Sequence, residues 1–237
     1  MDITQLHPAF LIIIVILLVL IRYGFEKIVS RIFKSIPVER PGVQLFARGF
    51  ILIFFNIAVL TLFGLLKVDL FAFAESGTGI IILAIGFGFG IIVALLSLLA
   101  IKAGFGGGYD SLVSESKLDK SLSLATFIVL AGLSEDIFFI GFVQNILTPS
   151  LGWGAIIVYL VLFIAYHYAN VISGIEKKEE FLGTLPVRLL VSLLLSLSFY
   201  LTGTLLYGVI VHNFIDTLSY VALLYAVRQK RTQISSP

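Results

Sequence analysis

Seven long apolar runs dominate this sequence and constrain its fold more than any other feature. At 1.5 Å per residue, a helix formed by each run is long enough to cross about 30 Å of lipid hydrocarbon. Of the 237 residues, 59% are hydrophobic and only 13% are charged, which excludes an ordinary soluble domain. The sequence therefore predicts an all-α, polytopic transmembrane helix bundle. The predicted spans are 8–22, 48–66, 79–101, 122–147, 151–173, 186–202 and 204–226.

The rest of the chain indicates one integral membrane domain over residues 1–237, because no internal repeat or low-complexity tract divides it. The first run is interpreted as a retained span, since no Lys or Arg precedes it and no small-residue cleavage site follows. The last two runs meet around Gly203, where either a tight turn or a re-entrant segment would fit. The absence of cysteine excludes disulfides, thiolate metal sites and a cysteine nucleophile.

Lys and Arg are distributed very unequally between the predicted connections. Fifteen of the 16 basic residues fall in the first, third and fifth connections and the C-terminal tail, and only Lys67 lies in the other set. Basic residues collect on the cytoplasmic side of membrane proteins, so we predict that the N-terminus lies outside and the C-terminus inside. The first connection then contains Arg22, Lys27, Arg31, Lys34, Arg40 and Arg48.

Five ionisable side chains lie within three of the predicted spans, where charge is costly. An acid at the bilayer centre costs roughly 2.5–3.5 kcal/mol even on the lenient insertion scale. Several such groups need partners or a function, and their concentration on three spans favours a functional site. The candidate catalytic residues are Glu135, Asp136, His167, His212 and Asp216.

The spacing of these residues predicts which of them act together. His212 and Asp216 are four positions apart and share one face of a helix. Glu135 and Asp136 are neighbours, about 100° apart around the helix, so only one of them can point directly into a shared site. The other should contact an adjacent helix or orient the first.

The glycine-rich segment "IGFGFG" at 85–90 superficially resembles a phosphate-binding loop. No strand precedes it, however, and it lies inside an apolar run. Small residues at close spacing let helix backbones approach one another in lipid. We therefore interpret this segment as a helix-packing surface.

Three segments that carry the candidate residues resemble motifs of the CPBP family, the CAAX prenyl protease and bacteriocin-processing group of intramembrane proteases. "EDIFFI" at 135–140 resembles E-E-x-x-x-R, and "FIAYH" at 163–167 resembles F-x-x-x-H. "HNFID" at 212–216 resembles H-x-x-x-N or H-x-x-x-D. The motifs follow one another in the family's order, and the resemblance covers residues 122–226, which we interpret as a CPBP-like catalytic core.

This resemblance implies a metal-independent, glutamate-type intramembrane endopeptidase in the cell membrane of a prokaryote. Glu135 would activate water, His167 would orient Glu135 or the water, and His212 with Asp216 would stabilise the oxyanion. No cofactor is implied. The implied partners are membrane lipids and a membrane-associated or prenylated peptide or protein that reaches the site from the cytoplasmic side. No nucleic-acid partner is expected.

Two positions depart from the family pattern. The second acid is Asp136, which is one methylene shorter than Glu, and the arginine position is occupied by Ile140, which removes a cation. Either another interaction replaces that arginine or the protein has lost the activity.

Three other functions stay open. Two histidines with carboxylates form a plausible zinc set for an intramembrane metalloprotease, although no H-E-x-x-H helix is present. A catalytically inactive membrane protein, for bacteriocin immunity or scaffolding, would tolerate Ile140. A proton or ion carrier also uses intramembrane acids and histidines, although the inverted repeats typical of transporters are not visible.

Cysteine labelling tests the predicted orientation, because the chain has no cysteine of its own. Single cysteines at Ser30, Ser35 and Ser235 should react with a membrane-impermeant maleimide only when the cytoplasmic face is made accessible. Labelling of these positions in intact cells would reverse the assignment.

Overall fold

A computed structural model describes residues 6–33, 40–73, 77–102, 113–114, 116–172 and 176–235. In these ranges the chain is helical and forms no strand, and seven helical stretches are long and apolar enough to cross a membrane. The predicted all-α transmembrane bundle is therefore confirmed. The α-helices are α1 (Pro8–Ile32), α2 (Pro41–Leu62), α3 (Gly77–Lys102), α4 (Lys117–Ala125), α5 (Ala131–Phe138), α6 (Asn145–Leu151), α7 (Gly154–Ile172), α8 (Lys178–Thr202) and α9 (Leu206–Ser235).

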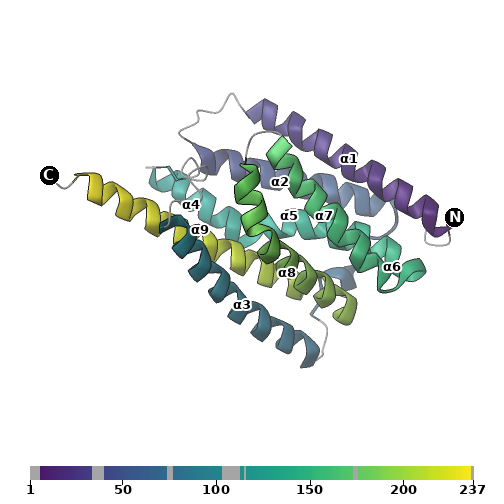
Figure 1. The fold of residues 1–237 in the computed structure, drawn as a ribbon. Helices are drawn as coiled ribbons and strands as arrows, with labels where there is room; N and C mark the ends of the chain where they lie inside the picture. Colours follow the sequence, from purple (N-terminus) through teal and green to yellow (C-terminus); the bar gives the residue numbers. More distant parts are fainter. Residues whose placement is uncertain are drawn as a thin grey trace.

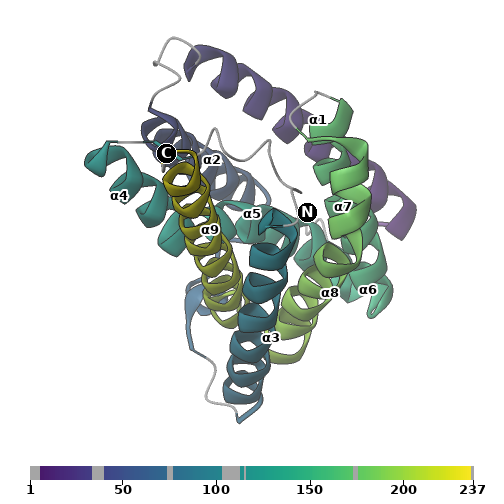
Figure 2. The same cartoon turned by 60° about the vertical axis from the view of Figure 1, so that its left-hand side comes forward.

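The most buried stretch is 117–151, which combines α4, α5 and α6. The π-helical segments Thr126–Leu130 and Phe139–Gln144 join these three helices into one unit. In its most apolar window 67% of the residues are buried, against 22–44% in the other six stretches. In Figures 1 and 2, α5 lies in the middle of the bundle, with α1 on one side and α3 on the other. The predicted span 122–147 is therefore the core around which the rest packs.

The first two predicted spans were too short. Helix α1 continues to Ile32 rather than ending at residue 22, and α2 begins at Pro41 rather than at 48. Four basic residues assigned to the first connection lie inside these helices instead. For Arg22 and Arg48 the physical reason is that partners inside the protein satisfy the basic side chain, whereas Arg31 is exposed in the last turn of α1. The four residues are Arg22, Lys27, Arg31 and Arg48.

The stretch before Gly203 is a full helix and not a re-entrant segment. Helix α8 runs for 25 residues without interruption, with Pro186 inside its third turn. At Gly203 the backbone adopts φ 72°, a left-handed conformation that glycine accepts without strain. The chain therefore reverses in a tight turn and enters α9.

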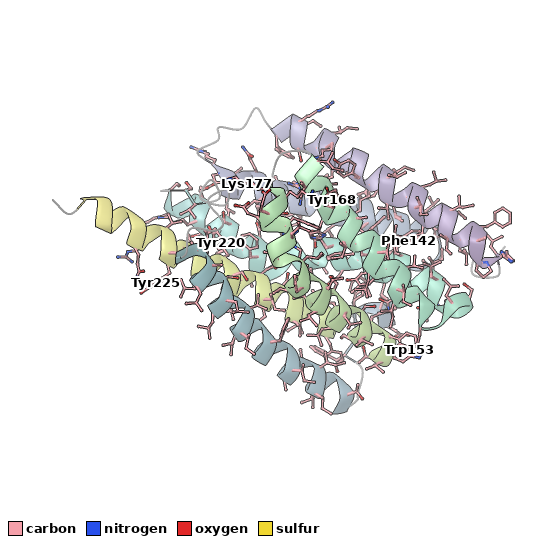
Figure 3. The ribbon with its side chains drawn as sticks, viewed as in Figure 1. Phe142, Trp153, Tyr168, Lys177, Tyr220 and Tyr225 are labelled. Carbon is pink, nitrogen blue, oxygen red and sulfur yellow. The ribbon has the colours of Figure 1, made fainter. Side chains whose placement is uncertain are left out.

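Aromatic side chains lie near both ends of the bundle. The Trp153 ring packs against Tyr200 with centroids 4.2 Å apart, and Trp153 is 57% exposed. Tyr225 on α9 is half exposed, and Figure 3 shows it toward the opposite end from Trp153. Trp and Tyr gather at membrane–water interfaces, which fits a bundle that spans the bilayer between them. The start of α1 and the end of α9 lie at opposite ends (Figure 1), while the N-outside orientation stays a prediction.

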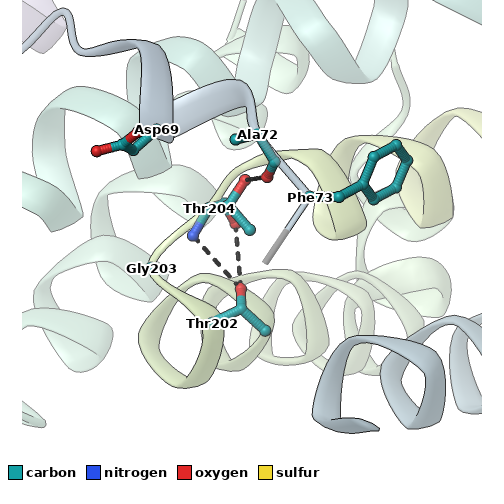
Figure 4. Close-up of a pocket in the computed structure, with 6 residues that line it drawn as sticks. All are labelled: Asp69, Ala72, Phe73, Thr202, Gly203 and Thr204. Atoms are coloured by element: carbon teal, nitrogen blue, oxygen red, sulfur yellow. Dashed lines mark hydrogen bonds between the residues drawn. The ribbon is translucent and has the colours of Figure 1, made fainter. Parts of the chain in front are cut away.

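A hollow of about 260 Å³ lies beside the α8–α9 turn (Figure 4). Thr204 Oγ1 donates to the Ala72 carbonyl at 2.7 Å, and the Leu205 amide donates to the Leu70 carbonyl at 2.8 Å. These bonds tie the turn to the short 3₁₀ helix Val68–Phe71 and the residues after it. None of the five candidate residues lines the hollow, whose walls are Asp69, Ala72, Phe73, Thr202, Gly203 and Thr204.

Helices α3 and α9 run side by side (Figures 1 and 2), and two glycines of α3 permit this approach. A Cβ atom added to Gly86 would lie 2.4 Å from the Val211 side chain, and one added to Gly90 would lie 2.9 Å from Phe214. Such distances are too short for real atoms. The interpretation of 85–90 as a helix-packing surface is therefore confirmed.

Substituting Gly86 and Gly88 by alanine distinguishes the effect of close packing on stability from the effect of helix propensity. Gly86→Ala should lower the thermal unfolding midpoint, because overpacking a close helix contact costs about 1–3 kcal/mol. Gly88→Ala is the matched control, since no atom lies within 4 Å of a Cβ added there. Thermal unfolding of both purified variants in one detergent measures the difference. Equal midpoints would contradict the close contact between α3 and Val211.

Candidate active site

Helix α5 carries both acids of the first motif and is bounded on each side by a π-helical segment. Such segments place an extra residue in a turn and are frequent at functional sites. Backbone groups displaced from the regular pattern need other partners inside lipid. The Asn213 side chain of α9 is the partner of two such backbone groups. Its Nδ2 donates to the Val129 carbonyl at 3.3 Å, and its Oδ1 accepts from the Gly132 amide at 2.8 Å. Asn213 therefore holds α9 directly against the segment that carries the acids.

Gly132 allows the neighbouring histidine to come equally close. A Cβ atom at position 132 would lie 2.8 Å from both His212 Cβ and Asn213 Oδ1, so a larger residue would push α9 away from α5. Sequence reasoning assigned no role to Gly132 or Asn213. The available signal was an amide side chain in an otherwise apolar run, directly beside a candidate histidine.

His212 lies between the two acids of α5. Its Nδ1 is 3.0 Å from Asp136 Oδ1, which is a hydrogen bond. Its Nε2 faces the opposite way and lies 3.9 Å from Glu135 Oε2 and 3.7 Å from Asp216 Oδ2. Asp136 thus contacts the adjacent helix, as the second acid of the pair was expected to do, and Glu135 is the acid that faces the shared space.

His167 approaches Glu135 from α7. Its Nε2 lies 3.8 Å from Glu135 Oε2. Its Nδ1 lies 3.0 Å from the Phe163 carbonyl, which can only accept, so Nδ1 carries the hydrogen. The Phe163 ring packs on the imidazole at 4.3 Å and edge-on against Phe139 at 5.1 Å between centroids. The motif F-x-x-x-H therefore has a physical basis, because Phe163 orients the histidine one turn later.

The structure brings all five candidate residues into one cluster, from α5, α7 and α9. Around Glu135 Oε2 and His212 Nε2, the distances of 3.7–3.9 Å are too long for direct hydrogen bonds. Such separations suit a bridging water or a substrate atom. The side chains of Glu135 and Asp216 are 28% and 32% exposed, whereas that of Asp136 is 1% exposed. The first two can meet a reactant, and Asp136 can act only through His212.

A second polar cluster, which sequence reasoning missed, lies on the other side of α5. Arg22 of α1 donates from Nη2 to the Ser134 carbonyl at 3.1 Å and from Nε to Asn56 Oδ1 of α2 at 3.3 Å. Glu26 lies between Arg22 and Arg48, with an ion pair to each. Arg22 and Arg48 were assigned to the first connection. The one signal against that assignment was that each residue directly adjoins an apolar run.

Ile140, at the position of the motif arginine, is 1% exposed and belongs to the apolar core. Its immediate surroundings along the helix are Phe138, Phe139 and Phe142, all fully buried. This position therefore contributes packing and no charge to the site.

Among the described residues, no group of three or more His, Asp or Glu side chains is arranged to hold a metal ion. The cluster offers the chemistry of two partly exposed carboxylates and two imidazoles whose facing atoms lie 3.7–3.9 Å apart.

Comparisons with known proteins bear on the same residues. Residues 117–218 match the family model described as Rce1-like, type II CAAX prenyl endopeptidase. Neither the comparison with curated proteins nor that with solved structures gave a match. The matched segment contains the five clustered residues and overlaps most of the core expected at 122–226. Over residues 117–218, the chain is therefore similar to the Rce1-like group of the CPBP family, whose motifs the same residues resemble.

Proposed function

We propose that this integral membrane protein is an intramembrane endopeptidase in which Glu135 activates the attacking water. The observation that carries the proposal is the position of Glu135 Oε2, which lies 3.8 Å from His167 Nε2 and 3.9 Å from His212 Nε2 while the carboxylate stays accessible. A water held between Glu135 and His167 would be within reach of a base and of an orienting nitrogen, with His212 Nε2 close by. The Rce1-like family supports peptide hydrolysis as the reaction class.

His167 is suited to orient that water. Because its Nδ1 hydrogen is directed to the Phe163 carbonyl, the neutral ring presents an unprotonated Nε2 that accepts a hydrogen bond. A water that donates one hydrogen to Glu135 and the other to His167 has its lone pairs free. The oxygen lone pair then attacks the scissile carbonyl carbon as Glu135 takes the proton.

His212 is suited to stabilise the oxyanion that this attack creates. With Nδ1 donating to Asp136, its Nε2 donates in the imidazolium form, and the carboxylates of Asp136 and Asp216 lie beside that charge. One such donor is worth about 3–4 kcal/mol of transition-state stabilisation. Glu135 then returns its proton to the leaving amine as the C–N bond breaks, which restores the carboxylate.

The substrate class follows from the surroundings of the site. The cluster lies within helices long enough to span a membrane, so the peptide must be delivered from the bilayer or its surface. We propose a membrane-associated or prenylated peptide or protein that enters from the cytoplasmic side of a prokaryotic cell membrane. A catalytically inactive immunity or scaffolding protein is the second candidate, because Ile140 removes the motif cation.

Glu135→Gln should abolish turnover while the fold survives. Gln keeps the size and hydrogen bonding of Glu but cannot take a proton from water. The assay is cleavage of prenylated and unprenylated peptides by protein reconstituted in vesicles, with thermal unfolding measured on the same sample. Undiminished cleavage by a folded Gln variant would rule out the mechanism, and an inactive wild-type protein would favour the scaffolding role.

Asp136→Asn is the matched control for this experiment. Asn still accepts a hydrogen bond from His212 Nδ1 through its Oδ1, so His212 keeps its orientation and loses only the adjacent charge. We expect reduced but measurable turnover. If Asp136→Asn is as inactive as Glu135→Gln, the division between a reacting and an orienting acid is wrong.

Treatment with a metal chelator separates the proposed mechanism from the zinc alternative. Water activation by Glu135 needs no ion, so activity should be unchanged after dialysis against a zinc chelator. Metal content by mass spectrometry, measured on the same protein before and after dialysis, is the check. Loss of activity that stoichiometric zinc restores would instead assign His167, His212 and the carboxylates as ligands.

A further inference from the structure

Arg22 is the most deeply buried cation in the described part of the chain, and it donates a hydrogen bond to the residue before Glu135. It is 1% exposed. Its guanidinium lies over three aromatic rings, at 5.1 Å from the Phe138 centroid, 5.3 Å from Phe139 and 4.8 Å from Tyr166. Burial of a cation is strongly unfavourable unless charge, hydrogen bonds and aromatic faces replace its water. Here the aromatic rings, Asn56 and the Ser134 carbonyl replace that water.

The Ser134 carbonyl accepts hydrogen bonds from two side chains of other helices, Arg22 and Asn56. Arg22 Nη2 and Asn56 Nδ2 both donate to the carbonyl of Ser134. Asn56 is fully buried, and its Oδ1 in turn accepts from Arg22 Nε. The Ser134 carbonyl belongs to the peptide unit that leads into Glu135, so two helices, α1 and α2, hold the backbone from which the proposed base projects.

The charge of this cluster also acts on the base. Arg22 and Arg48 lie close enough for their charges to interact with the Glu135 carboxylate. Glu26 balances part of this charge, since its carboxylate is paired with both arginines. At the same time, position 140 contributes no cation, because Ile140 is packed in the apolar core.

We propose that Arg22 is a positioning residue for Glu135 and that it supplies from α1 the positive charge that Ile140 leaves out of the motif. The inference rests on the proposed function of Glu135 as the base. Arginine suits the role because its planar fork donates to Ser134 and Asn56 in fixed directions at once, whereas a lysine ammonium cannot reproduce this geometry. Since Arg22 is buried, it acts through the α5 backbone and does not contact the substrate.

The inference is tested by separating kcat from KM in two variants of Arg22. Arg22→Met removes the charge and both donors, and kcat should fall by about 10- to 100-fold, the range expected when a base is misplaced by an ångström or less. Arg22→Lys keeps the charge and should retain an intermediate kcat. KM should be unchanged in both, because no substrate contact is lost.

Asp119→Ala is the control for loss of stability alone. Asp119 is also 1% exposed and also ties two helices together, since its Oδ1 accepts from the Val43 amide at 3.0 Å. It lies outside the proposed site, so this variant should have a lower thermal midpoint and an unchanged kcat per folded molecule. If folded Arg22→Met keeps the wild-type kcat, or loses activity only in proportion to its unfolded fraction, the inference is overturned.

Two further results keep the inference separate from the proposed function. If Arg22→Met does not fold, Asn56→Leu replaces it as the test, because it removes the other donor to the Ser134 carbonyl. A lower kcat at constant KM in this variant supports the inference. A wild-type kcat overturns it. An active wild-type protein with inactive Glu135→Gln and unaffected Arg22 variants would refute the inference alone. An inactive wild-type protein would refute the proposed function and the inference with it.

Discussion

Charged groups inside a lipid-embedded bundle cannot rely on water, and this constraint organises the centre of the protein. Asp136 is almost completely buried and forms a hydrogen bond to His212. Arg22 is equally buried and donates to the Ser134 carbonyl while it lies over aromatic rings. Each of these groups joins α5 to a different helix. The partners that compensate for buried charge are therefore the same contacts that assemble the site.

The charged residues around α5 fall into two groups that differ in how far their side chains are buried. Glu135 and Asp216 are accessible and face the polar space, where the proposed chemistry takes place. Asp136 and Arg22 are buried, and each forms a hydrogen bond inside the bundle, to His212 and to the Ser134 carbonyl. In the proposed mechanism, the first pair exchanges protons or hydrogen bonds with a substrate, and the second pair positions the groups that do so. The arrangement of these groups depends on close helix packing, as the contacts at Gly132 show.

Neighbouring turns of one helix account for the parts of the site that sequence spacing predicted. His212 and Asp216 share a face, and their side chains are 3.7 Å apart. His167 bonds to the carbonyl of Phe163, one turn earlier. These relations depend only on helical geometry, so residues four apart in an apolar run are enough to expect them. Contacts between different helices cannot be predicted from sequence spacing in this way.

The sequence by itself determined the class of fold, the seven membrane-spanning stretches and the identity of the acids and histidines, because lipid imposes long apolar helices and makes each ionisable residue conspicuous. Tertiary structure alone decided that Asp136 faces His212, that Asn213 joins α9 to α5, and that Arg22 belongs to the interior. For a basic residue at the end of an apolar run, the sequence does not distinguish a side chain exposed to water from one that contacts another helix. Only the packing of α1 against α2 and α5 creates the carbonyl, amide and aromatic faces that make the buried position of Arg22 favourable.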